Sequence, residues 1–219
     1  MAEAAAQTAT ALAHQFDDLE QQREAGYLGM WTFLVTEILF FGGMLTGYTA
    51  YRALYPEAFA IGSHHLSYLI GTVNTAVLIL SSLTMALAVH AAELGRRKTL
   101  IVFLIATMIL GAAFLGFKSF EYLHKFEEGL IPGPNFSYTG PHAPQVQLFL
   151  SFYFALTGMH ALHMVIGLGI LTFLVLQAGR GKFTREYHAP VVVSGLYWHF
   201  VDIVWIFLYP LLYLIGARQ

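Results

Sequence analysis

The stretch VQLFLSFYFALTGMHALHMVIGLGILTFLVL, residues 146–176, decides the fold class of this chain, because none of its 31 residues is Asp, Glu, Lys or Arg. An α-helix rises about 1.5 Å per residue, so roughly 20 apolar residues cross the hydrocarbon core of a bilayer. Four more apolar stretches of spanning length lie at residues 27–51, 66–92, 100–123 and 191–215. The sequence therefore predicts an all-α fold, an integral membrane bundle of five transmembrane helices.

Two regions complete the predicted organisation. Residues 1–26 are acidic and rich in Ala, and we interpret them as an N-terminal cytoplasmic tail or surface helix. Residues 27–219 form the five-helix transmembrane domain. The segments between the spans, such as YPEAFAIGSHH at residues 55–65, carry Pro, Gly or clustered charges and are predicted to be turns.

Composition supports the membrane assignment and excludes several classes of function. Of the 219 residues, 57% are hydrophobic and 11% are charged, against about 25% charged residues in soluble domains. A net charge of -2 without a basic stripe argues against binding nucleic acid. The chain has no Cys, which excludes disulfides and thiolate-held metals.

The distribution of Lys and Arg predicts the orientation, because cytoplasmic loops collect these residues. One side of the predicted bundle carries Arg23, Arg96, Arg97, Lys98, Arg180, Lys182 and Arg185. The other side carries only Arg52, Lys125 and Arg218. We therefore expect a cytoplasmic N-terminus and a C-terminus on the outer side.

Polar residues near the middle of the spans mark the candidate site, because burying an ionisable group at that depth costs about 2.5–3.5 kcal/mol. They are Glu37, Asn74, His160, His163, His199 and Asp202. We expect one buried, proton-linked polar layer in which imidazole and carboxamide groups satisfy the two carboxyls. Glu37 is either a protonated acid bonded to a neighbouring helix or a proton relay or carboxylate ligand. His199 and Asp202 are predicted to bond to each other or to the adjacent helix.

Two further pairs have simpler predicted roles. Lys118 and Glu121, at spacing i,i+3, are predicted to form an ion pair at the membrane edge. Trp198 and Trp205, at spacing i,i+7, would wall the polar layer or form a face toward a partner or lipid.

The histidines raise the question of a metal. A pair of imidazoles at His160 and His163 could ligate one ion. A bis-imidazole haem or a di-iron site would need a second matching pair or further His-rich boxes, and the sequence has neither. We therefore predict no metal in this chain.

Several motifs resemble subunit III of the haem-copper terminal oxidases. The run WHFVDIVW at residues 198–205 resembles the signature of that family's last helix. In the same order as in the family, FLVTEILFF resembles the segment around its intramembrane Glu, and VNTAVLILSS and GMHALHMVIG resemble two further motifs. FKSFEY resembles a helix-end motif, with Lys118 where many members have Gln. The resemblance covers residues 27–216 and is closest to the short five-helix bacterial form.

The resemblance implies a set of expectations. The chain would be an accessory subunit in the bacterial inner membrane, packed against the catalytic subunit I and also against subunit II. It would carry no haem or copper, which belong to the partner subunits, and it would bind phospholipid. It would support proton uptake during reduction of O2 to water. Alternatives are the similar accessory protein of a nitric oxide reductase, and a small proton-coupled transporter that uses Glu37 and Asp202 as relay groups.

Overall fold

The computed structural model describes residues 14–214, which form helices and connecting loops without a strand. The helices are α2 (Leu19–Leu54), α3 (Pro56–His64), α4 (Tyr68–Glu93), α5 (Arg97–Glu127), α6 (Ala143–Gly179) and α7 (Ala189–Tyr213). All except α3 are long and apolar enough to cross a membrane. The predicted all-α bundle of five spanning helices is confirmed.

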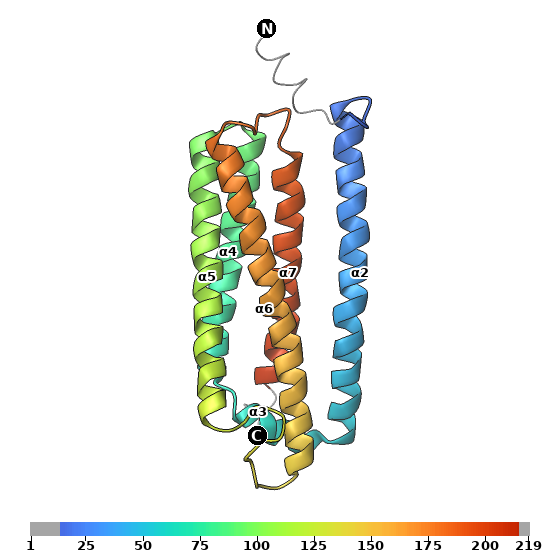
Figure 1. Cartoon of the computed structure of the whole chain (residues 1–219), viewed down its shortest axis with the longest axis vertical. Helices are drawn as coiled ribbons and strands as arrows, with labels where there is room; N and C mark the ends of the chain where they lie inside the picture. The colour runs from blue at the N-terminus through green and yellow to red at the C-terminus, as the bar shows by residue number, and fades with distance from the viewer. Residues whose placement is uncertain (1–13, 215–219) are drawn as a thin grey trace.

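The five long helices run antiparallel from one end of the molecule to the other (Figure 1). The start of α2 and the α4–α5 and α6–α7 connections share one end, and α3 lies at the opposite end beside the end of α7. Helix α7 is the most buried of the five spans, since it packs against α2, α4 and α6. Helix α2 stands at the edge of the bundle and is the least buried.

Helix α2 begins well before the predicted span, at Leu19. The carboxylate of Asp18 caps it by accepting a hydrogen bond of 2.7 Å from the backbone N–H of Gln21, which satisfies one of the free donors of the first turn. Part of the predicted tail is therefore a direct extension of the first span. Residues 1–13 of that tail, and Arg218 at the other end, lie outside the described residues.

The prediction of a turn at residues 55–65 is wrong, because this segment forms α3. Pro56 occupies the first helical turn, where no backbone donor is required. The buried Ser63 donates a hydrogen bond of 2.8 Å to the carbonyl of Leu212, and Tyr48 of α2 donates to the carbonyl of Leu211. Helix α3 and α2 thus satisfy carbonyls that α7 leaves free at its C-terminal end.

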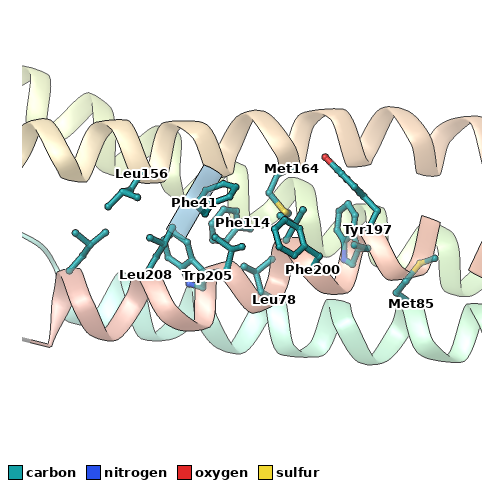
Figure 2. Close-up of a cluster of buried hydrophobic side chains, with 14 of the residues drawn as sticks. Phe41, Leu78, Met85, Phe114, Leu156, Met164, Tyr197, Phe200, Trp205 and Leu208 are labelled. Carbon is teal, nitrogen blue, oxygen red and sulfur yellow. The ribbon is translucent and has the colours of Figure 1, made fainter. Parts of the chain in front are cut away.

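Aromatic rings pack with Leu and Met side chains in the core of the bundle (Figure 2). Trp198 and Trp205 are 1% and 0% exposed, and their indole N–H groups donate to Ser81 (2.9 Å) and Thr75 (3.1 Å) of α4. The prediction that these two tryptophans form a partner or lipid face is therefore wrong. They lie inside the chain because α4 offers a hydroxyl acceptor opposite each indole.

Candidate functional site

Glu37 of α2 meets His163 of α6, with 3.1 Å between Oε2 and Nε2. The other ring nitrogen of His163, Nδ1, lies 2.8 Å from the carbonyl oxygen of Met159. A carbonyl only accepts, so Nδ1 carries a hydrogen. The remaining contact then needs one further proton, held either by Glu37 as a neutral acid or by His163 as an imidazolium. In both forms the pair as a whole is uncharged, which makes it tolerable inside a membrane.

Aromatic residues hold the imidazole of His163 in place. The Phe41 ring lies 5.3 Å from it, and the Tyr197 ring stacks on it at 6.5 Å between centroids. The Tyr197 hydroxyl also donates to the backbone carbonyl of His163 at 2.9 Å. The side chain of Glu37 remains 17% exposed, so this fixed pair borders the outer surface of the chain.

Glu37→Gln is expected to change the free energy of unfolding by less than about 1 kcal/mol, because a Gln amide N–H replaces the acid O–H toward His163. Glu37→Leu, the matched control, should cost about 1–3 kcal/mol because it leaves His163 Nε2 without a partner. Unfolding of the purified chain in mixed micelles measures both values. An equal loss for the two variants would contradict the neutral form and indicate a carboxylate–imidazolium pair.

The predicted single polar layer is not formed. His160 points into the core, where the rings of Phe114 and Trp205 lie 5.3 Å and 5.1 Å away. Within residues 14–214, no hydrogen-bond partner reaches either ring nitrogen of His160 or the buried amide of Asn74. Imidazole satisfies the carboxyl of Glu37 but not that of Asp202. The described residues also include no group of three or more His, Asp or Glu side chains placed to hold a metal ion.

His199 and Asp202 meet α4 rather than each other. His199 Nδ1 lies 2.7 Å from the hydroxyl of Ser82, which confirms for His199 the predicted contact with the adjacent helix. The carboxyl oxygens of Asp202 are buried and meet no donor of hydrogen-bond geometry in the described part of the chain, although the Ser82 hydroxyl lies close enough to interact with them. The Ser82 hydroxyl thus lies beside both side chains.

Lys118 and Glu121 form the predicted ion pair, at 2.9 Å, but the pair is buried inside the bundle, with 4% and 3% of the side chains exposed. The ammonium also donates to the hydroxyls of Tyr153 (3.0 Å) and Tyr213 (2.9 Å), so all three of its donors are used. Tyr213 in turn donates to Glu121. The two tyrosines, from α6 and α7, are the residues that sequence reasoning missed.

The family model described as cytochrome c oxidase subunit III matches residues 19–217. Quinol oxidase subunit 3 of Bacillus subtilis is 31% identical, with 90% of this chain and 92% of the relative aligned. Cytochrome bo(3) ubiquinol oxidase subunit 3 of Pseudomonas aeruginosa is 32% identical, with 93% and 91% aligned. Cytochrome c oxidase subunit 3 of Corynebacterium diphtheriae is 33% identical, with 86% and 87% aligned.

Proposed function

Because this chain belongs to the cytochrome c oxidase subunit III family, we propose that it is the accessory, non-catalytic subunit of a proton-pumping haem-copper oxidase that reduces O2 to water. The observation that carries the proposal is the family match along residues 19–217. It is supported by relatives that are named as oxidase subunits and align with this chain over more than nine tenths of their own length. In this proposal subunit I supplies haem and copper, and this chain stabilises it, with subunit II as a second neighbour.

The Glu37–His163 pair supports a contribution to proton uptake. One exchangeable proton lies between Glu37 Oε2 and His163 Nε2, which are 3.1 Å apart, and the pair borders the surface of the chain. Such a pair can pass a proton between its two members without changing its net charge. Its place between the edge helix α2 and the bundle allows a partner subunit to approach it.

A phospholipid is the second component that we propose. Helix α2 presents large apolar side chains to the outside, among them Leu28 (71% exposed), Leu39 (70%) and Leu54 (67%). At one end of α2, Arg23, which pairs with Glu20 at 3.2 Å, lines a groove of about 190 Å³ beside α7 together with Glu186. A guanidinium suits a phosphate group, and the apolar side of α2 suits the acyl chains.

The proposed location is the bacterial inner membrane, with the N-terminus in the cytoplasm. The end of the bundle that holds the start of α2 also holds the α4–α5 and α6–α7 connections. Arg96 lies in the α4–α5 connection and Arg97 and Lys98 begin α5, while the α6–α7 connection contains Arg180, Lys182 and Arg185. An excess of basic residues on one side is typical of the cytoplasmic face.

Removing this chain from the oxidase tests the function. We expect the depleted enzyme to reduce O2 at first but to take up protons more slowly and to lose activity during sustained turnover, and we expect the purified chain to restore both properties. Oxygen consumption over many turnovers and proton uptake in vesicles are the measurements. If the depleted oxidase keeps its activity over many turnovers, the proposal is contradicted. Co-purification of this chain with a nitric oxide reductase instead of an oxidase would also contradict it.

A further inference from the structure

A groove of about 380 Å³ runs along the outer face of the bundle between α4 and α7. Its rim is apolar and partly exposed, with Ile79 56%, Leu83 55% and Ile206 48% exposed. Its floor is polar, because Asp202 and the Ser82–His199 pair line it. A polar floor beneath an apolar rim is unusual on a surface that faces lipid.

Asp202 is the member of this floor whose carboxyl group is not fully satisfied within the described residues. The residue is 3% exposed, and both carboxyl oxygens are buried without a donor of hydrogen-bond geometry in residues 14–214. The Ser82 hydroxyl can donate its single hydrogen to one carboxyl oxygen of Asp202 while His199 Nδ1–H donates to Ser82, so the second carboxyl oxygen still has no donor in the described part of the chain. A buried acceptor without a donor is costly, so the groove is incomplete on its own.

The depth of the groove limits what can complete it. Asp202 lies near the middle of α7 and Ser82 near the middle of α4, far from the headgroups at either side of the bilayer. A lipid acyl chain reaches this depth but offers no hydrogen-bond donor. A transmembrane helix of another polypeptide supplies both an apolar surface and a donating side chain.

We propose that the α4–α7 groove is the docking site for a transmembrane helix of another oxidase subunit, which presents a hydrogen-bond-donating side chain to Asp202. The inference rests on the proposed function, since it requires a partner subunit in the membrane. The small side chain of Ala86 in the groove lets a helix approach closely. Asp202 then serves as the polar anchor of an otherwise apolar interface.

The first test compares Asp202→Leu with Asp202→Asn in the complete oxidase. Asp202→Leu should reduce retention of the chain during detergent purification by about tenfold or more, a change that corresponds to about 1.4 kcal/mol. Asp202→Asn keeps a carbonyl acceptor and should retain most of the chain. The isolated Leu variant should unfold no more easily than the wild type. Weaker retention accompanied by an equal loss of stability in the isolated chain would show an internal role and overturn the inference.

The second test uses the fact that the chain has no Cys. Ile206→Cys at the groove rim should react with a lipid-soluble maleimide in the isolated chain and be protected in the oxidase. Ile109→Cys, on the exposed side of α5 (64% exposed), controls for differences in reagent access between the two preparations. Equal reactivity of the groove cysteine in both preparations would show that lipid fills the groove and would overturn the inference.

The two proposals fail in different ways. Suppose that purification through a tag on the wild-type chain yields a haem-containing oxidase, while the cysteine of Ile206→Cys stays reactive in that oxidase. The proposed docking site is then wrong, and the proposed function stands. If the wild-type chain recovers no such oxidase, the proposed function fails and the docking site fails with it.

Discussion

Lys118→Met is expected to lower the free energy of unfolding by about 3–5 kcal/mol, because it leaves a buried carboxylate without its cation. Glu121 is 3% exposed and would keep only the hydrogen bond from the Tyr213 hydroxyl. The Tyr153 hydroxyl would lose its contact with the ammonium as well. Unfolding of the purified chain in mixed micelles, followed by circular dichroism, measures the loss.

The double variant Lys118→Met/Glu121→Met is the matched control. Removing both charges replaces the pair by apolar side chains of similar length, which is often close to neutral in stability. The double variant should therefore recover most of the loss caused by Lys118→Met alone. Glu121→Met alone supplies the second single variant. If the losses of the two single variants simply add in the double variant, Lys118 and Glu121 are not coupled, which would contradict the buried ion pair.

Trp198→Ala is expected to cost about 3–5 kcal/mol, the range for removing a large buried ring. The indole of Trp198 is 1% exposed and lies between two glycines. A Cβ at Gly111 of α5 would come within 2.8 Å of this ring, and a Cβ at Gly167 of α6 within 2.9 Å. The ring thus fills a slot that both glycines open, and its loss leaves a cavity between three helices.

Trp31→Ala is the matched control for this experiment, because the Trp31 side chain is 57% exposed on α2. We expect this variant to change the free energy of unfolding by less than about 1 kcal/mol. Gly111→Val approaches the same slot from the other side and should also destabilise the chain, through overpacking. Similar small losses for the two tryptophan variants would contradict the burial of Trp198 inside the bundle.

The five spanning helices could be predicted from sequence because their signal is local. An apolar run such as residues 146–176 is long enough to span a bilayer, and few other structures accommodate it. Helix α3 could not be predicted in this way, because it has only nine residues and carries Pro56 and Gly62, residue types that are typical of turns. Its helical state depends on packing, since Phe59 and Ala60 are buried within the fold.

The candidate site could be predicted only in part, because sequence spacing fixes the face of one helix but not its rotation toward its neighbours. Spacing i,i+3 correctly paired Lys118 with Glu121. The same spacing suggested a common environment for His160 and His163. In the structure His163 meets α2, whereas His160 lies among core rings.

The tyrosines around Lys118 escaped prediction for the same reason, since they come from two other helices. Tyr153 belongs to α6 and Tyr213 to α7, 35 and 95 residues further along the chain. The sequence did indicate that such partners exist, because a lysine within a membrane span must find hydrogen-bond acceptors. Both tyrosines lie toward the same end of the bundle as Lys118, so they were the available candidates.

We propose that this chain supports a redox-active partner and performs no electron transfer itself. The most direct measurement purifies the oxidase through a tag on this chain, separates the subunits under mild conditions, and records the absorption spectrum and metal content of each. We expect haem and copper in the partner subunits, and neither a Soret band nor bound copper in this chain. A stoichiometric haem or copper that remains with the separated chain would contradict it.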